Sequence, residues 1–331
     1  MQSNKLVIAL VADSLTTSCL AKECRTLTLT PLNYRWILRF QKPDLLFVES
    51  AWEGHRSRWK YKVATYPGGR NNNRKLEAVV SYARDLGIPT VFWNKEDGVH
   101  FDRFIDSARL FDHIFTVDAN CVEKYKNLVG KNVTVNTLMF PVQTETHFFR
   151  GFEFKSNSAN FVGSYSRKIH ESRRVWQDLM FSACASSGIK TVVYDRNSER
   201  ISSNYRYPDF AGMDVRASIP HADTAQVYRD HLISLNVNTI DNSPSMYSRR
   251  LVEILACGGI AVTNPSPAVD RYFVDYCNVV KSSQEAEDLF ARLKYGPSAQ
   301  DLQRAEAGAR YVQSEHTWSQ RLDDVRRVIG L

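Results

Sequence analysis

Short apolar runs alternate along the whole chain with segments in which apolar residues recur every three or four positions. The apolar runs predict buried strands, and the longer periodicity predicts amphipathic helices. Regular alternation of the two is typical of parallel sheets covered by helices. In the first half, the predicted strands are residues 6–11, 44–49, 90–93, 113–117 and 133–138, and the predicted helices are residues 33–40, 74–86 and 119–128.

A polar stretch at residues 151–158 interrupts this pattern, which then restarts. The second series of predicted strands is residues 159–163, 190–194, 232–236, 260–263 and 278–280, and an amphipathic helix is predicted at residues 318–329. Single hydrophobic cores stop growing at about 250–300 residues, so two series in one chain predict two domains. We place them at residues 1–150 and 151–315, and expect the C-terminal segment, residues 316–331, to fold back on the N-terminal domain. The predicted fold class is α/β, with two Rossmann-like doubly wound domains whose functional loops face an interdomain cleft.

Composition narrows the class of ligand and the setting of the protein. The chain has 43 Lys and Arg against 36 Asp and Glu, and this net charge of +7 favours anionic ligands without requiring nucleic acid. The six cysteines are scattered, without a CxxC pair or a Cys/His cluster at zinc spacing, so we expect reduced thiols, no metal site and no cofactor. No apolar run of membrane-spanning length occurs, and we expect a cytoplasmic protein, free or peripheral to a membrane.

The segment 247–259 carries the clearest chemical signal. Tyr247 and Ser248 precede two arginines, Arg249 and Arg250, at the start of a predicted helix, and Glu253 follows about one turn later. A helix N-terminus presents unpaired backbone N–H groups to a phosphate, to which an arginine adds a charged fork. The carboxylate of Glu253 could then accept hydrogen bonds from ribose hydroxyls. The alternative is two solvated arginines and an Arg250–Glu253 ion pair worth only a few tenths of a kcal/mol.

A second candidate phosphate contact follows the first strand of the second series. Gly163, Ser164 and Tyr165 form a strand-to-helix loop, and Arg167 and Lys168 add positive charge to it. A glycine lets the backbone approach a ligand closely, although an ordinary turn would have the same composition. GxGxxG and GxxxxGK[ST] motifs are both absent, which argues against a dinucleotide oxidoreductase and a P-loop nucleotidase.

Candidate acid–base residues follow two strands of the first half. Glu49 ends the predicted strand at 44–49, and Asp97 and His100 follow the strand at 90–93. Any of the three could take a proton from an acceptor hydroxyl. Asp97 could instead cap the helix that begins near residue 101. A basic and aromatic stretch at residues 52–62 would suit stacking on sugars or on bases.

These residues carry a resemblance to a known family. The chain resembles the CgeB-like (spore maturation protein type) glycosyltransferases of the GT-B fold through its segments 248–259 (SRRLVEILACGG), 235–238 (LNVN), 43–52 (PDLLFVESAW) and 93–97 (WNKED). The resemblance implies two Rossmann-like domains, with a nucleotide-sugar donor held by the second and an acceptor approaching the first. It further implies that Glu253 binds the donor ribose and that Arg249 or Arg250 neutralises the pyrophosphate.

The implied activity is hexosyl transfer from a nucleoside-diphosphate sugar, such as a UDP-sugar, to a hydroxyl of a glycan, lipid-linked, protein or small-molecule acceptor. We expect retention of the anomeric configuration. Because no DxD motif ends a predicted strand, we also expect metal independence. Many retaining relatives carry a Glu eight positions before the ribose-binding one, whereas this chain has Ser245, so the donor sugar is not predicted. The alternatives are a nucleotide-sugar epimerase or hydrolase and a basic protein that binds nucleic acid or another polyanion, although nucleic acid is not the expected partner.

Overall fold

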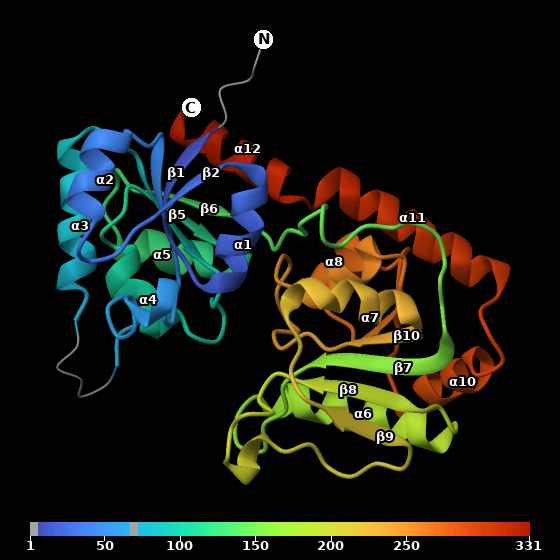
Figure 1. Ribbon diagram of the computed structural model, residues 1–331. Coiled ribbons are helices and arrows are strands. Elements are labelled where there is room, and N and C mark those ends of the chain that lie inside the picture. The colour runs from blue at the N-terminus through green and yellow to red at the C-terminus, as the bar shows by residue number, and fades with distance from the viewer. Residues whose placement is uncertain (1–5, 67–71) are drawn as a thin grey trace. The chain divides into compact units, whose positions relative to one another are not determined.

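The computed structural model describes residues 6–66 and 72–331. The chain divides into two compact units (Figure 1). Unit 1 is Met1–Met139 together with Trp318–Leu331, and unit 2 is Phe140–Thr317. Within the described residues each unit contains one parallel six-stranded sheet.

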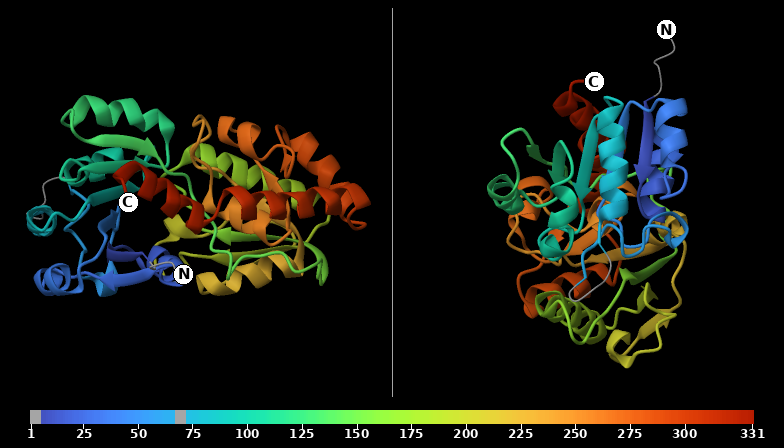
Figure 2. Two further views of the ribbon diagram at one scale, coloured as in Figure 1. Left: turned by 90° about the horizontal axis from the view of Figure 1, so that it is seen from above. Right: turned by 90° about the vertical axis from the view of Figure 1, so that its left-hand side faces the viewer.

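The sheet of unit 1 has the strand order β2-β1-β3-β4-β5-β6. The strands are β1 (Val7–Val11), β2 (Arg25–Thr28), β3 (Leu45–Glu49), β4 (Thr90–Asn94), β5 (His113–Thr116) and β6 (Thr134–Thr137). Every residue of β3 and β4 is buried because helices cover both faces of the sheet (Figures 1 and 2). The strand order reverses between β1 and β3, and ligands of doubly wound sheets bind at the carboxyl ends of the strands at such a switch point.

The helices of unit 1 are α1 (Ser14–Glu23), α2 (Tyr34–Gln41), α3 (Arg74–Asp85), α4 (Phe101–Ala108), α5 (Val122–Leu128) and α12 (Trp318–Ile329). The last of these comes from the far end of the sequence and contacts α1. The Trp318 ring lies 5.4 Å from that of Trp93, and Nε of Arg321 donates to the carbonyl of Met139. These contacts explain why α12 belongs to unit 1.

The sheet of unit 2 has the strand order β12-β11-β10-β7-β8-β9. The strands are β7 (Ser156–Gly163), β8 (Thr191–Asp195), β9 (Met213–Arg216), β10 (His231–Asn236), β11 (Ile260–Thr263) and β12 (Asn278–Val279). The helices are α6 (Glu171–Ser186), α7 (Thr224–Asp230), α8 (Arg249–Ala256), α9 (Pro267–Tyr272), α10 (Ser283–Leu293) and α11 (Ala299–Glu315). The switch point of this sheet lies between β7 and β10, which places the end of β7, at Gly163, where a ligand is expected.

The strands that the sequence pattern missed lie at sheet edges. The strands β2 and β9 were not predicted, and both are edge strands with largely exposed or half-exposed residues. Such strands have no buried face and therefore lack an apolar run. The strand β7 begins within the polar stretch expected to separate the domains, because its first two residues are exposed and need no apolar side chains.

The boundary between the units falls between Met139 and Phe140, ahead of the predicted break after residue 150. The intervening segment is tied to unit 2 by polar contacts. The carbonyl of Phe148 accepts from Arg229 Nη2 at 2.8 Å, and Nε2 of His147 lies 2.8 Å from Oγ1 of Thr224. The second boundary, between Thr317 and Trp318, lies close to the one expected after residue 315.

Candidate functional site

The end of β7 in unit 2 is approached by an arginine from α8. Nε of Arg250 donates to the carbonyl of Val162 at 2.6 Å, and its guanidinium lies 4.4 Å from the ring centre of Phe161. The expected alternative, a solvated Arg250 paired with Glu253, is wrong, because no ion pair joins these two side chains in the described chain. The fixed guanidinium faces Gly163, where a side-chain Cβ would lie 2.9 Å from Nη2 of Arg250.

Two further arginines lie beside the same glycine, Arg173 through its side chain and Arg196 through its backbone, while the side chain of Arg196 is exposed. Nη2 of Arg173, on α6, donates to the carbonyl of Ser164 at 2.9 Å, and the backbone N–H of Arg196, after β8, donates to the carbonyl of Gly163 at 2.8 Å. Burial and then repulsion from Arg250 and Arg196 lower the pKa of Arg173 to about 10. Within the described residues, none of the three arginines has a carboxylate within ion-pair distance. We call Arg173, Arg196 and Arg250 the arginine cluster.

The cluster contains buried N–H groups whose hydrogen-bonding capacity the protein leaves unused. Nε of Arg173 and Nη1 of Arg250 are buried and have no hydrogen-bond partner in the described part of the chain. The hydroxyl of Tyr207 beside them is also buried and without a partner there. Burying an unsatisfied donor costs about 1–3 kcal/mol, and more for a charged group. An anion with several oxygens would accept hydrogen bonds from these unused donors and balance the positive charge.

Glu253 lies on the buried side of α8 and accepts a hydrogen bond. Its Oε1 is 2.7 Å from Nε2 of His221, which precedes α7. Burial raises the pKa of Glu253, but the hydrogen bond from His221 and the charges of His147, His221 and Arg249 outweigh it and lower the pKa to about 2. Glu253 is therefore an ionised acceptor at neutral pH.

His147, His221 and Glu253 together form a group of metal-ligand type. The potential ligand atoms of the three side chains lie within 4.8 Å of one another, and this is the one such group in the described residues. The sequence did not predict it, because His147 lies more than 70 positions before the other two. The hydrogen bond between His221 and Glu253 is an alternative use of the same atoms.

The other predicted donor-side residues occupy different environments. Ser164 offers its carbonyl to Arg173, and Ser248 is the residue before α8, with its N–H donating to Asn238 Oδ1 at 2.9 Å. The guanidinium of Arg249 lies 5.0 Å from the ring centre of Phe140. The two predicted arginines thus diverge, and Arg250 is the one at Gly163.

The two predicted tyrosines are both buried. The hydroxyl of Tyr165 donates to Asp178 at 2.8 Å, and that of Tyr247 donates to the carbonyl of Phe140 at 2.7 Å. Tyr247 also packs edge-on against Phe273, 4.8 Å away between ring centres. The hydroxyls of both tyrosines therefore bond within the protein, and they fix the positions of the loops that carry Ser164 and Ser248.

Glu49 in unit 1 belongs to a charged cluster at the switch point of that sheet. Its Oε1 accepts from Lys95 Nζ at 3.0 Å and from the backbone N–H of Asp13 at 2.5 Å. The carboxylate of Asp13 accepts in turn from the backbone N–H groups of residues 52–54. Glu49 is fully buried, and its Oε2 has no hydrogen-bond partner among the described residues. This cluster fixes the loop after β3 against the loop after β1.

Asp97 lies in a separate polar cluster between the end of β4 and α5. Its carboxylate accepts from Nδ2 of Asn94 at 2.6 Å and from the hydroxyl of Tyr125 at 2.9 Å, and it is fully buried. It does not make a side-chain cap of α4, whose N-cap residue is His100. The capping alternative for Asp97 is therefore wrong. The side chain instead joins the loop after β4 to α5.

The pKa of Asp97 gives a testable dependence of stability on pH. Burial raises this pKa to about 7, against hydrogen bonds from Thr116 and Tyr125 that lower it. In the unfolded chain an aspartate titrates near 3.9, so between about pH 4 and about pH 7 the native state binds the extra proton. This contribution to the free energy of unfolding is present below that window and is lost as pH rises through it, by up to about 1.4 kcal/mol per pH unit.

Urea unfolding of the wild type and of Asp97→Asn, at pH values from about 5 to about 8, isolates the contribution of Asp97 to the free energy of unfolding. We expect the wild type to lose stability relative to the variant up to about pH 7, and the difference to stay level above it. A difference that is independent of pH would contradict the assignment.

His100 is the one predicted acid–base residue of the three with accessible surface. Its ring packs edge-on against Trp52, with 5.1 Å between ring centres. Burial lowers its pKa, against the opposite influence of Glu96. The imidazole is therefore predominantly neutral at neutral pH and able to accept a proton. Glu49, Asp97 and His100 make their contacts with different residues rather than with one another.

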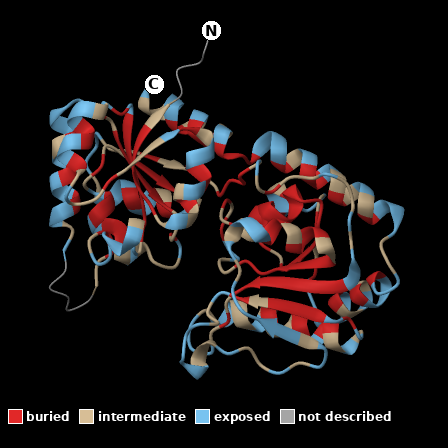
Figure 3. Cartoon of the chain, in the orientation of Figure 1, coloured by how far each residue is buried: buried red, intermediate tan, exposed pale blue. Residues whose placement is uncertain are grey.

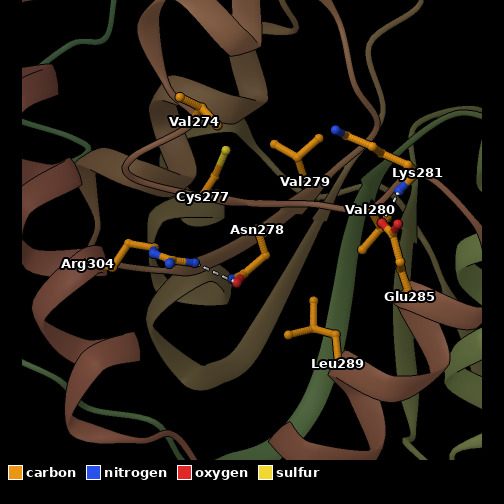
Figure 4. A pocket seen from close by; sticks show the side chains of 9 residues that line it. All are labelled: Val274, Cys277, Asn278, Val279, Val280, Lys281, Glu285, Leu289 and Arg304. Atoms are coloured by element: carbon orange, nitrogen blue, oxygen red, sulfur yellow. Dashed lines mark hydrogen bonds between the residues drawn. The ribbon is translucent and has the colours of Figure 1, made fainter.

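A pocket of about 360 Å³ lies elsewhere in unit 2, around β12 and α10 (Figure 4). Arg304 on its wall donates to Asn278 Oδ1 at 3.0 Å. The strands β11 and β10 separate β12 from β7 in the sheet. The pocket is therefore not part of the arginine cluster.

The comparisons with known proteins agree with this architecture. No curated protein matches the sequence. Among solved structures, Anabaena HepE, crystallised with UDP-glucose, aligns with a TM-score of 0.61 at 10% identity over 98% of this chain and 91% of HepE. A glycosyltransferase from Rickettsia africae aligns with a TM-score of 0.54 at 10% identity over 97% of this chain and 89% of its own. Sucrose-phosphate synthase from Thermosynechococcus elongatus aligns with a TM-score of 0.52 at 10% identity over 93% and 83% of the two chains.

These similarities confirm the predicted α/β fold of two Rossmann-like units, the GT-B architecture. Residues 159–327 match the sequence model of the family described as "Glycosyl transferase-like". The match takes in all six strands of unit 2 except the first three residues of β7, and it includes all three residues of the arginine cluster. The chain therefore belongs to the glycosyl transferase-like family.

Proposed function

We propose that the chain transfers a sugar from a UDP-sugar to an acceptor hydroxyl, and that the diphosphate of the donor binds the arginine cluster. The cluster is the observation that carries the proposal. It combines three positive charges, unused buried N–H groups and a position at the switch point of the sheet of unit 2. HepE, whose fold is similar, was crystallised with UDP-glucose.

The chemistry of transfer explains why such a cluster would matter. When the bond between the sugar and the diphosphate breaks, negative charge develops on the departing oxygen. Fixed cations stabilise that charge without having to reorganise during the reaction. Arg250 is held by Val162 and Phe161, and Arg173 by Ser164, so both guanidinium groups are already oriented. Bound phosphate oxygens would also reduce the repulsion among the three arginines.

Glu253 is proposed to hold the ribose of the donor, as the family resemblance implies. An ionised carboxylate offers about four lone-pair positions, so its hydrogen bond with His221 leaves capacity for ribose hydroxyls. His221 keeps Glu253 ionised and fixes one of its oxygens. Gly163, Ser164 and Ser248 complete the proposed donor side, while Tyr165 and Tyr247 support their loops.

On the acceptor side we propose His100 as the residue that takes the hydroxyl proton. Its lowered pKa and accessible ring suit it for this role better than the fully buried Glu49 and Asp97. Membership of the CgeB-like subgroup, retention of configuration and independence of metal are further parts of the proposal. The acceptor classes proposed are a glycan, a lipid-linked sugar, a protein or a small molecule.

A donor screen tests the proposal. The purified chain is incubated with individual UDP-hexoses, with and without a panel of acceptors, in the presence of EDTA, and released UDP is measured. We expect acceptor-dependent release that EDTA does not reduce, and NMR of the product should show the anomeric configuration of the donor. Release without acceptor would indicate a hydrolase, and conversion of the donor into another UDP-sugar would indicate an epimerase. Loss of activity in EDTA, restored by a metal ion, would contradict metal independence and direct attention to His147, His221 and Glu253.

Gly163→Ala should damage both the fold and donor binding. The new Cβ would lie 2.6 Å from Cε1 of the fully buried Phe161 and 2.9 Å from Nη2 of Arg250. Relieving this overlap should cost about 1–3 kcal/mol of unfolding free energy and displace the guanidinium. Urea unfolding and calorimetric titration with UDP measure the two effects. The control is Gly130→Ala, whose Cβ meets nothing within 4 Å. Equal stability and equal UDP affinity in the two variants would refute the prediction.

A further inference from the structure

The outer face of α2 in unit 1 carries large apolar side chains that the fold leaves uncovered. Leu32, just before the helix, is 83% exposed, Trp36 is 58% exposed and Phe40 is 61% exposed. Trp36 and Phe40 are four residues apart and lie on one face of α2, with their rings 6.2 Å apart, and Leu32 belongs to the turn that leads into the helix. We call Leu32, Trp36 and Phe40 the apolar ridge. In Figure 3 the outward side of α2 is coloured largely as exposed.

The ridge is not needed to hold α2 on its sheet. The opposite face of the helix presents Tyr34, Ile37 and Leu38, which are buried in the core of unit 1. Single exposed apolar residues are ordinary on protein surfaces, but a contiguous exposed patch usually marks an interaction site. We therefore expect Trp36 and Phe40 to contact a partner outside the chain.

The charges beside the ridge indicate the chemistry of that partner. Arg35, Arg39 and Lys42 are exposed, and none of them forms an ion pair within the described chain. The sequence from residue 25 to residue 43 contains no Asp or Glu. The guanidinium of Arg35 is held 5.0 Å from the ring centre of Tyr82 and 5.5 Å from that of Tyr34, on the flank between the two faces. That of Arg39 lies 6.0 Å from Phe40.

We propose that the apolar ridge and its flanking cations dock unit 1 on an anionic lipid bilayer. Aromatic rings concentrate at the boundary between headgroups and acyl chains, and helices that lie in this boundary combine Trp, Phe and Leu on one side with Lys and Arg beside them. Basic residues beside the ridge add electrostatic attraction to an anionic membrane surface. A protein partner would need a surface rich in acidic groups around an apolar groove, whereas a bilayer of anionic phospholipids supplies both features everywhere.

The docking is peripheral and reversible. The helix α2 has 8 residues, too few to span a bilayer, and no helix in the described part of the chain is long and apolar enough to cross one. Because the attraction is partly electrostatic, raised salt should weaken it. The proposal stands on the surface of unit 1 alone and does not depend on the donor site in unit 2.

Co-sedimentation with sucrose-loaded vesicles tests the proposal on the full chain. We expect the wild type to sediment with vesicles of phosphatidylcholine and phosphatidylglycerol at low salt, and to remain in solution with pure phosphatidylcholine. The double variant Trp36→Ala/Phe40→Ala should lose at least tenfold in partition coefficient. The single variant Trp36→Phe, which keeps Phe40, should retain most of the wild-type partition coefficient. Arg39→Glu/Lys42→Glu should reduce the partition coefficient and its dependence on salt.

Ile201→Ala is the matched control, because Ile201 of unit 2 is 98% exposed and lies outside the ridge. It should sediment like the wild type. Circular dichroism and thermal unfolding check that the variants fold. The proposal is overturned if the wild type stays in solution with anionic vesicles, or if the double variant sediments equally well. Dimerisation of the wild type that the double variant abolishes, without vesicle binding, would assign the ridge to a second copy of the chain and would also overturn it.

Discussion

Replacing Arg250 by alanine is expected to lower the turnover of sugar transfer by about a hundred- to a thousandfold, the usual cost of removing one fixed donor from developing negative charge. The reason is its position: Nε donates to the carbonyl of Val162, Nη2 lies near Gly163, and Nη1 is buried without a hydrogen-bond partner in the described residues. Turnover at saturating donor and acceptor, measured by UDP release, gives the result. The fold should survive, because the change removes a buried charge that has no carboxylate partner in the described residues.

Arg249→Ala provides the comparison within the same helix turn. Its guanidinium lies over Phe140 rather than at Gly163, and its one described influence on the donor side is the lowering of the pKa of Glu253. We therefore expect a loss well below tenfold. Equal losses in the two variants would show that the proposed distinction between the arginines is wrong.

Replacing Glu253 is expected to abolish discrimination between ribose and deoxyribose in the donor nucleotide. A hydrogen bond to a charged group contributes about 1.5–3 kcal/mol, so the wild type should bind UDP about tenfold to a hundredfold more tightly than the deoxy analogue that lacks the recognised hydroxyl. Titrations with 2′-deoxy-UDP and 3′-deoxy-UDP identify which hydroxyl is bound. In Glu253→Ala the analogues and UDP should bind alike.

Glu253→Gln serves as the conservative variant for this experiment. Its amide oxygen can still accept from His221, so the local structure is preserved, but a neutral acceptor should retain only part of the discrimination. A Glu253→Ala protein that is folded and still prefers UDP over both analogues would exclude the ribose assignment.

The sequence predicted the parts of the fold that its apolar pattern controls. The central strands β3, β4, β10 and β11 are almost entirely buried, and each was predicted within one or two residues of its bounds. The sequence also placed Arg249 and Arg250 at the start of a helix, where α8 begins, but it did not distinguish between the two arginines.

Other members of the candidate site come from distant segments. Arg196 follows β8, so only the folded sheet brings its backbone to Gly163, whereas Arg173 is on α6, the next helix along the chain. The charges nearest to that glycine in sequence, Arg167 and Lys168, are exposed, as is the side chain of Arg196. The sequence did contain an indication of Arg173 as a phosphate contact, because this arginine lies in the first turn of the helix that follows the Gly163 loop.

His221 illustrates a second limit of prediction from sequence. It meets Glu253 across a separation of 32 residues, and nothing in its neighbourhood distinguishes it from a surface histidine. Conversely, Asp97 and His100 are three residues apart but face different environments, one fully buried beside Tyr125 and the other against Trp52. Spacing along the chain indicates shared chemistry only where the backbone also directs the side chains to one place.

Calorimetric titration with UDP and with UMP, in the presence of EDTA, tests most directly whether the arginine cluster binds a nucleoside diphosphate. The account predicts that the wild type binds UDP at least tenfold more tightly than UMP, a difference of about 1.4 kcal/mol or more, because the second phosphate reaches the arginine cluster. In Arg250→Ala this preference should largely disappear while UMP affinity changes little. Equal affinities for UDP and UMP in the wild type, or an undiminished preference in the variant, would contradict the account.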